Sequence, residues 1–393
     1  MRTQYLFGTL FCLNLLNYID RQALYSLFPL LQIDLQLTDL QLGALASCFM
    51  LVYMCYAPLV GYLADRSSRP RLIGLSALLW SGATLACGAA CNYISLFIPR
   101  ALIGVGEGGF TTIAQPFLAE HYPAKKHASV LALFGLALPV GSALGYMLGG
   151  LIGHHWGWRI AFMAVGIPGV FLGLLAWLGL KDVARETQSP KLRPTLKDYF
   201  PLFKNKPFLS VCFAQAMSTF VMGGLAAWMP MYLHRYLGWD TAQAGTRFGG
   251  LVIICGAVGT LLGGKLAARW IEKSSTAYYK LISIAFLAAL PFCWLTLCAT
   301  HEALVLLGLA AALTLLFIPT GAIAAALVAT TSENIRSMAF ALNIFIIHLL
   351  GDAISPTLVG WISDGWSLKA AVFCCTLMLL PGIWASSRTA HSI

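Results

Sequence analysis

Charged residues are scarce in this chain. Asp, Glu, Lys and Arg make up 10% of its 393 residues, whereas a soluble domain carries roughly 25%. The hydrophobic share is 59% and the mean hydropathy is +0.78. Such a chain could not cover its own surface in water, so lipid must be the solvent for most of it. The composition therefore predicts an integral, multi-pass membrane protein.

The chain also lacks the patterns of metal, nucleotide and catalytic sites. Its eleven cysteines are scattered through apolar windows and form no C-x-x-C arrangement, so we expect no metal site. No H-E-x-x-H or G-x-S-x-G pattern occurs. The glycine-rich run at residues 104–109 looks like a phosphate loop but follows no strand. We therefore expect no cofactor and no enzymatic activity.

Twelve apolar windows are long enough to cross a bilayer, which takes about 20 residues each. They are residues 5–28, 40–63, 72–90, 94–118, 128–152, 156–180, 208–233, 242–268, 279–298, 303–326, 335–362 and 368–386. The net charge of +10 would suggest nucleic acid in a soluble protein. Here the basic residues sit in every second short connection, which predicts two cytoplasmic termini and no nucleic-acid partner.

The two halves of the chain echo each other. The run that begins at Gly61 after the second window has a counterpart that begins at Gly264 after the eighth, and windows five and eleven share their glycine spacing. We predict a six-helix bundle at 1–180, a cytoplasmic linker at 181–206 and a second bundle at 207–393. Parallel six-helix repeats are typical of the major facilitator superfamily, an all-α membrane fold of two pseudo-symmetric bundles.

The loop after the second window resembles the superfamily's motif between helices two and three. Gly61 would permit close helix approach, and Asp65, beside Arg66, could take a helix end or an arginine of the other bundle. Such a contact would break when the bundles rock, so we predict a gating role. The alternative is a plain positively charged cytoplasmic loop.

Ionisable residues inside the first and fourth windows predict a functional site. Such residues cost about 2.5–3.5 kcal/mol each on insertion scales, so they face a cavity or a partner. Asp20 and Arg21 differ by about 100° around the helix, so at least one should reach another helix. Arg100 and Glu107 share a face, as do Asn17 with Arg21 and Thr111 with Glu107. The alternatives are a helix cap and a structural ion pair.

The eleventh window carries the charged residues of the second half. His348, Asp352 and Ser355 share a helical face, and Pro356 interrupts the helix hydrogen bonds. We expect Asp352 to be functional. For His348 a packed, structurally satisfied side chain is the alternative.

Together these residues resemble the spinster branch of the major facilitator superfamily. The resemblance is carried by Asn17-Tyr18-Ile19-Asp20-Arg21, Arg100 with Gly104-Val105-Gly106-Glu107, Pro139-Val140-Gly141-Ser142 and Gly351-Asp352-Ala353-Ile354-Ser355-Pro356. The first two runs are shared with the anion:cation symporter branch, and the last separates spinster-like chains from it. Spinster proteins are proton-linked transporters whose animal members move lysophospholipids or sphingosine phosphate.

The resemblance implies roles for particular residues. Asp20 and Glu107 would take protons, while Arg21 and Arg100 would be their charge partners or anchors for an anionic head group. We thus expect a monomeric, proton-coupled carrier of an amphipathic, lipid-derived solute that works by alternating access in the bacterial inner membrane, in contact with its lipids. A carrier of a small organic anion is the first alternative. A membrane-embedded enzyme or sensor is the second, but the chain shows neither a catalytic set nor a soluble output domain.

Overall fold

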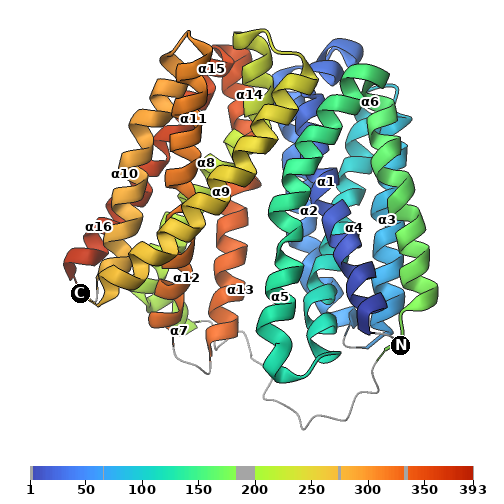
Figure 1. The fold of residues 1–393 in the computed structure, drawn as a ribbon, viewed down its shortest axis with the longest axis horizontal. Coiled ribbons are helices and arrows are strands. Elements are labelled where there is room, and N and C mark those ends of the chain that lie inside the picture. Colours follow the sequence, from blue (N-terminus) through green and yellow to red (C-terminus); the bar gives the residue numbers. More distant parts are fainter. Residues whose placement is uncertain (1–2, 65, 183–199, 273–275, 332–334, 393) are drawn as a thin grey trace. The chain divides into compact units, whose positions relative to one another are not determined.

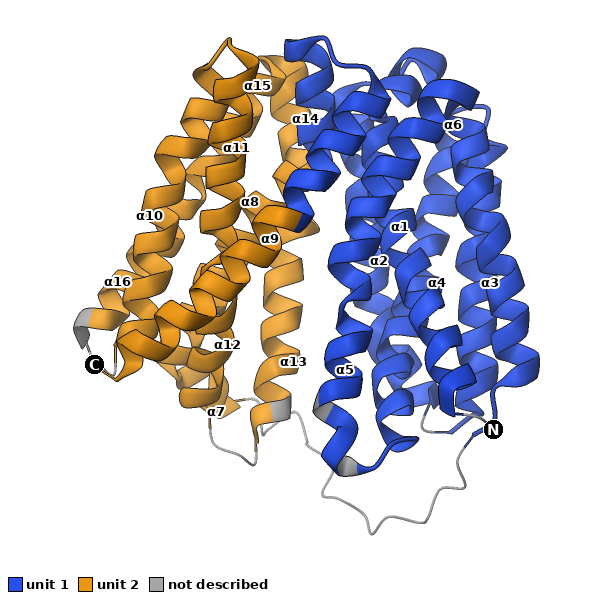
Figure 2. Cartoon of the chain, in the orientation of Figure 1, with its two compact units in different colours: residues 1–186, 226–253 blue, residues 187–225, 254–393 orange. Residues whose placement is uncertain are grey.

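The computed structural model describes residues 3–64, 66–182, 200–272, 276–331 and 335–392, and these contain helices but no strand (Figure 1). Helix is the expected outcome, because a backbone surrounded by lipid must satisfy its hydrogen bonds within its own segment. The chain divides into two compact units, residues 1–186 with 226–253 and residues 187–225 with 254–393 (Figure 2).

Unit 1 is a bundle in which α1 and α3 pack on α6 while α2 and α3 pack on α4. Its helices are α1 (Thr3–Leu35), α2 (Asp39–Ala64), α3 (Arg69–Gly88), α4 (Tyr93–Glu120), η1 (Ala124–Lys126), α5 (His127–Gly135) and α6 (Ala137–Gly179). Two further helices, α8 (Lys206–Leu237) and α9 (Thr241–Ile271), run from one unit into the other, and residues 226–253 of them belong to unit 1.

Unit 2 is built around α10, which packs on α11 and α16. Its helices are α7 (Phe200–Lys204), α10 (Ala277–Cys298), α11 (Glu302–Phe317), α12 (Pro319–Ala329), α13 (Arg336–Ile347), η4 (His348–Asp352), α14 (Ser355–Gly365), α15 (Leu368–Leu377) and α16 (Leu379–Ser392). The remainder of α8 and α9 completes it.

Breaks within the helices match the predicted windows. Gly157 has a φ of 85°, a conformation that favours glycine, and it breaks α6 at the second residue of the sixth window. In the eleventh window, α13 gives way to the π-helical turn η4, and α14 restarts with Pro356 in its first turn. The predicted interruption near Ser355 and Pro356 is therefore confirmed.

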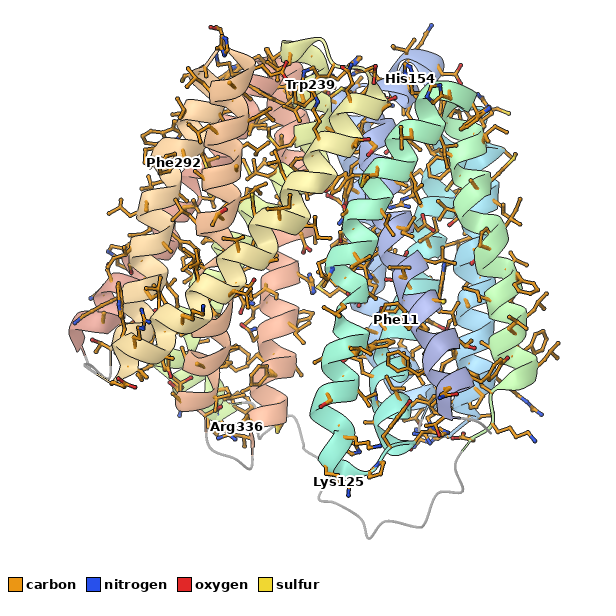
Figure 3. The ribbon with its side chains drawn as sticks, viewed as in Figure 1. Phe11, Lys125, His154, Trp239, Phe292 and Arg336 are labelled. Atoms are coloured by element: carbon orange, nitrogen blue, oxygen red, sulfur yellow. The ribbon has the colours of Figure 1, made fainter. Side chains whose placement is uncertain are left out.

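Nine stretches of the described residues are long and apolar enough to cross a membrane. One of them, Ser129–Gly179, covers two predicted windows. The windows outside these stretches are those of α1 and α4, the helices that hold the ionisable residues. In unit 1, Lys125 lies at one end while His154 and Trp239 lie at the other (Figure 3). In unit 2, Arg336 lies at one end of the bundle and Phe292 lies nearer the opposite end (Figure 3).

The compact units do not follow the predicted domain limits. Packing assigns residues 226–253 to unit 1 because Gly245 on α9 meets the backbone of α6 so closely that a Cβ would lie 2.2 Å from the Tyr146 carbonyl oxygen. The Tyr146 hydroxyl also donates to the Ala226 carbonyl oxygen at 2.8 Å. The limits at 180 and 206 reflect the sequence repeat and stay a prediction, and most of the predicted linker, residues 183–199, lies outside the described residues.

Candidate functional site

Two carboxylates and two guanidinium groups meet between α1 and α4 in unit 1. Arg21 Nε donates to Glu107 Oε2 at 2.6 Å, and Arg100 Nη1 donates to Asp20 Oδ1 at 3.3 Å. Both residues of α1 therefore reach across to α4, in two crossed pairs. Within each helix the acid and the base are not paired with each other.

The four side chains are almost wholly shielded. Glu107 and Arg100 are 0% exposed, Asp20 is 1% exposed, and only the Arg21 side chain, at 14%, retains some accessible surface. Burial makes each pair expensive to separate, because removing one member leaves an uncompensated charge away from water. Protonating the carboxylate removes its negative charge, so the arginine can separate from it without leaving an unpaired buried carboxylate.

Glycines explain how Glu107 comes to face α1. A Cβ on Gly104 would lie 2.5 Å from the Phe49 carbonyl oxygen of α2, and one on Gly106 would lie 2.7 Å from the Ser76 carbonyl oxygen of α3. Helix α4 is thus held closely by two neighbours, with Glu107 directed to a third. These contacts are the close helix packing that glycines permit in membrane proteins.

Aromatic rings surround the Arg21 guanidinium. Its central carbon lies 4.7 Å from the ring centre of Tyr53, 5.0 Å from Phe49 and 5.3 Å from Tyr18. These distances are typical of cation–π contacts, which stabilise a cation with little competition for its N–H donors. Arg21 therefore keeps donor capacity beyond its bond to Glu107.

Several buried polar atoms of the site have no hydrogen-bond partner in the described part of the chain. They are both side-chain atoms of Asn17, Arg21 Nη2, Arg100 Nε and Nη2, and Glu107 Oε1. Thr111, by contrast, donates to the Glu107 carbonyl oxygen at 2.9 Å and shares a 2.8 Å hydrogen bond with the Tyr53 hydroxyl. Unsatisfied buried groups are rare in native proteins, so this cluster has free capacity to bind water, protons or a polar group of a solute.

Thr84 on α3 completes the Asp20 environment. Its hydroxyl donates to Asp20 Oδ2 and also lies 3.0 Å from the Trp80 carbonyl oxygen one turn earlier. This residue could not be predicted from the sequence, because a threonine in an apolar helix is common and its hydroxyl is usually satisfied by the backbone of its own helix.

A second group of predicted residues comes together in unit 2. His348 Nδ1 lies 2.8 Å from Asp352 Oδ1, and these side chains are 22% and 20% exposed. Ser355 is fully buried, and its hydroxyl finds no partner among the described residues. Gly223 of α8 packs here, since a Cβ on it would lie 2.7 Å from the Cβ of Asp352. The described residues contain no group of three or more potential metal-ligand side chains.

The predicted gating loop is described only in part. Asp65 lies outside the described residues. A Cβ on Gly61 would make an ordinary 3.7 Å contact with Thr112, so close helix approach does not explain this glycine. The guanidinium carbon of Arg66, which follows the end of α2, lies 3.5 Å from the ring centre of Tyr62 on α2. The gating role of these residues stays a prediction.

The same loop holds an ion cluster that the sequence interpretation missed. Arg69, at the start of α3, bonds Glu120 at the end of α4 at 2.6 Å and Asp182 after α6 at 2.8 Å. Its guanidinium also lies 5.3 Å from the ring centre of Phe117. The arginine was visible in the motif, but its partners are far away in sequence and become neighbours only through helix packing.

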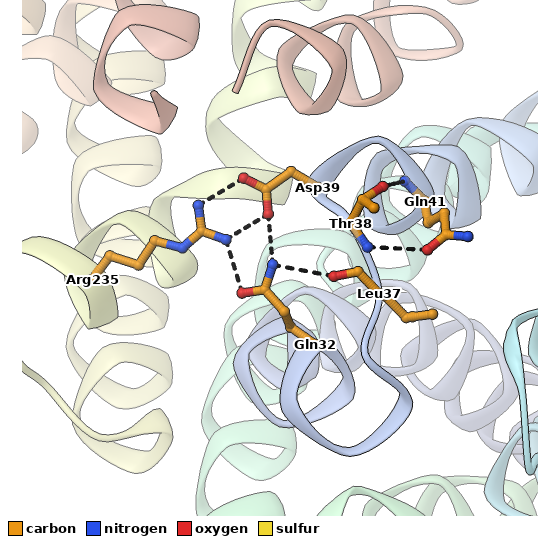
Figure 4. A network of polar contacts seen from close by, with 6 residues as sticks. All are labelled: Gln32, Leu37, Thr38, Asp39, Gln41 and Arg235. Atoms are coloured by element: carbon orange, nitrogen blue, oxygen red, sulfur yellow. Dashed lines mark hydrogen bonds and ion pairs between the residues drawn. The ribbon is translucent and has the colours of Figure 1, made fainter. Parts of the chain in front are cut away.

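Opposite this end of unit 1, a polar network joins α8 to α1 and α2 (Figure 4). Arg235 forms a two-pronged pair with Asp39, with Nη1–Oδ2 at 2.7 Å and Nη2–Oδ1 at 2.5 Å. Gln32 accepts from Arg235 at 2.9 Å and donates to Asp39 at 2.8 Å. Bidentate pairs of this kind are the strong ones. We call these three residues the α8 latch.

A helical bundle with long apolar helices and paired charges buried between them defines the class of multi-pass membrane transporters. The family model of the Major Facilitator Superfamily matches residues 10–346. "Protein spinster homolog 1" of Xenopus laevis is 33% identical over 388 residues, covering 90% of this chain and 72% of that protein. The chain therefore belongs to the major facilitator superfamily and, within it, to the spinster family.

Other comparisons agree with this assignment. "Probable sphingolipid transporter spinster homolog 2" of Arabidopsis thaliana is 28% identical, covering 98% of this chain and 86% of that protein. The crystal structure of a bacterial homologue of the human lysosomal transporter spinster has a TM-score of 0.88 at 21% identity, covering 99% of this chain and 97% of that one. The predicted fold class is confirmed, and the chain is a transporter rather than an enzyme.

Proposed function

We propose that this protein is a proton-coupled secondary transporter of an amphipathic, lipid-derived solute, similar to a lysophospholipid or sphingolipid, and that it works by alternating access. The observation that carries the proposal is the crossed pairing of Asp20 with Arg100 and of Glu107 with Arg21, both buried. The coupling role of the two carboxylates and the solute both belong to this proposal.

Coupling follows from what protonation does to such a pair. When Glu107 takes a proton, its attraction for Arg21 falls and the guanidinium becomes available to an anionic group. The Tyr53 and Phe49 rings hold the guanidinium in place meanwhile. A proton and an anionic head group thus influence the same arginine, which is the physical requirement for linking their movements.

The distribution of charge supports an amphipathic solute. Ionisable side chains inside the windows gather in unit 1, whereas unit 2 offers mainly His348 and Asp352 among apolar residues. A head group would interact with the first set and an acyl or sphingoid chain with apolar surface. The Arabidopsis relative, whose name specifies sphingolipid transport, favours the same class of solute.

A small organic anion is the second candidate. The observation in its favour is that, among the described residues, Arg100 has two donor atoms without a hydrogen-bond partner, Nε and Nη2, and Arg21 has one, Nη2. Two guanidinium groups with free N–H donors suit the planar geometry of a carboxylate. Such a solute would need no apolar surface in unit 2.

Uptake into liposomes separates the two candidates. Purified protein is reconstituted, a pH gradient is imposed, and accumulation of a labelled lysophospholipid is compared with that of a short carboxylate, with and without a protonophore. We expect lysophospholipid accumulation that the protonophore abolishes, and background levels of the carboxylate. Protonophore-sensitive uptake of the carboxylate alone would establish the second candidate instead.

We further propose that the protein is a monomer of the bacterial inner membrane with both termini cytoplasmic. The support is the Lys and Arg content of every second connection, including Lys125 and Lys126 after α4. A green fluorescent protein fused after the last residue should fluoresce, whereas alkaline phosphatase at the same position should be inactive. Active phosphatase would place the carboxyl terminus on the other side.

A further inference from the structure

The hydroxyl of Thr84 lies between two acceptors but carries one proton. Asp20 Oδ2 accepts from it, and the Trp80 carbonyl oxygen lies 3.0 Å from it. Thr84, Asp20 and Trp80 are 0%, 1% and 2% exposed. Because a hydroxyl can donate one hydrogen bond while accepting others, Thr84 can satisfy the ionised carboxylate or the carbonyl, but not both.

The two protonation states of Asp20 call for the two orientations of this hydroxyl. When Asp20 is ionised, Thr84 donates to the carboxylate. When Asp20 is protonated, the acid O–H donates to Thr84 Oγ1, and the Thr84 hydroxyl turns to donate to Trp80. No heavy atom has to move, and the Asp20 carboxyl group keeps a hydrogen bond to Thr84 in both protonation states, which avoids the cost of an unsatisfied buried group.

We propose that Thr84 is a positioning residue of the proton site, whose hydroxyl turns between Asp20 and the Trp80 carbonyl and so allows Asp20 to change protonation state while buried. This inference rests on the proposed function, because it assumes that Asp20 carries a coupled proton. It adds that a hydroxyl on α3, outside the two charge pairs, sets the pH at which that proton binds.

The direction of its effect follows from the strengths of the two hydrogen bonds. A hydrogen bond to an ionised group is roughly twice as strong as one between neutral groups. Removing the hydroxyl therefore weakens the ionised state of Asp20 more than the protonated one. The pH at which the site changes state should rise, by about one unit, which is a tenfold change in proton binding.

Other ionisable groups surround Asp20 and are unchanged by a substitution at Thr84. They are Arg100 and Glu107 on α4, Cys87 on α3 and Arg21 on α1, with Cys48 of α2 close to Arg100 and Cys87. Arg100 contacts the other carboxylate oxygen of Asp20, Oδ1. A shift caused by Thr84 can thus be separated from the contributions of its neighbours.

The test is solute exchange in liposomes at equal pH on both sides, with labelled lysophospholipid, measured across a pH series. Thr84→Val keeps the shape of the side chain but removes the hydroxyl, and its midpoint should move up by about one pH unit. Thr84→Ser keeps the hydroxyl and should retain the wild-type midpoint. Thr296→Val is a matched control, since the Thr296 hydroxyl donates to the Phe292 carbonyl oxygen at 2.9 Å in unit 2.

The outcomes are distinguishable. An unshifted midpoint in Thr84→Val, over a pH-dependent wild type, overturns the role of Thr84 and leaves the proposed function standing. A wild-type exchange rate that does not vary with pH overturns the proton site itself. If Thr84→Val does not insert, Thr84→Cys, a weaker donor, should shift the midpoint in the same direction. Infrared spectra then add a second readout. The carboxylic-acid band of Asp20 is identified by its absence from Asp20→Asn, and this band should shift in the Thr84 variants that lack the hydroxyl.

Discussion

Among single residues, Arg21 is the side chain that links the proton to the solute in the proposed mechanism. It bonds Glu107 at 2.6 Å through Nε, retains an unpartnered Nη2 and lies among the Tyr18, Phe49 and Tyr53 rings. A planar guanidinium suits all of these contacts at once, because it can stack on rings while its edge donates hydrogen bonds. The ammonium group of a lysine carries the same charge but is not planar, so it cannot stack on the rings in this way.

Arg21→Lys should therefore reduce transport strongly although the charge is conserved. We expect a loss of about tenfold or more in the initial rate of lysophospholipid uptake, because the ring contacts and the fixed N–H geometry are both lost. Arg388→Lys is the control, since Arg388 also lies over a ring, Trp384, but at the exposed end of α16. Equal rates in Arg21→Lys and wild type would show that the charge alone suffices.

The sequence predicted the members of this site but not their pairing. Burying Asp20 and Arg21 in an apolar helix is costly enough to predict partners on another helix. Which partner each residue takes depends on the lateral packing of α1 and α4. For adjacent positions such as 20 and 21, the sequence alone does not determine which of the two residues pairs with which residue of α4. Thr84 was unpredictable for a different reason, because its importance comes only from the carboxylate that packing brings to it.

At the scale of helices, α4 shows how a polar residue is placed. Gly104 and Gly106 bring the backbones of α2 and α3 so close that no side chain fits, and Glu107 is left facing α1. The glycine pattern could be recognised in the sequence as a packing signal. The identity of the two neighbours could not, because a helix face does not specify the helix that covers it.

Gly104→Ala should destabilise unit 1. The added methyl group would lie 2.5 Å from the Phe49 carbonyl oxygen, and overpacking of this kind costs about 1–3 kcal/mol. We expect a clearly lower melting temperature in detergent. Gly82→Ala on α3 is the matched control, because a Cβ there has nothing within 4 Å. If both variants melt together with the wild type, the packing account of α4 is wrong.

At the scale of the whole molecule, α8 and α9 show where a domain limit read from sequence and a compact unit diverge. The repeat places both helices in the second half, yet residues 226–253 pack with unit 1. The reason is chemical, since the α8 latch and the close approach of Gly245 to α6 hold them there. A sequence repeat shows which segments correspond to each other in the two halves. Packing shows which segments are in contact in one conformational state.

If the α8 latch opens during transport, weakening it should favour the open state. Arg235→Gln removes the bidentate pair with Asp39, and we expect opening to become about tenfold more frequent. Amide hydrogen exchange at residues 37–41 and 239–243 should accelerate accordingly. Arg159→Gln is the control, because it also removes an arginine–aspartate pair, that of Arg159 with Asp34 at 2.6 Å between α6 and α1, but leaves the α8 latch intact. Unchanged exchange in Arg235→Gln would show that this network does not limit opening.

If the buried carboxylates carry the coupled proton, replacing them by Glu107→Gln and Asp20→Asn should uncouple transport from the pH gradient. Each variant removes a titratable group while keeping nearly the same shape, so expression and membrane insertion should be normal. In liposomes, each should lose pH-driven accumulation of lysophospholipid yet retain exchange of labelled for unlabelled solute, which needs no net proton movement. Accumulation at wild-type levels in both variants would show that neither carboxylate carries the coupled proton.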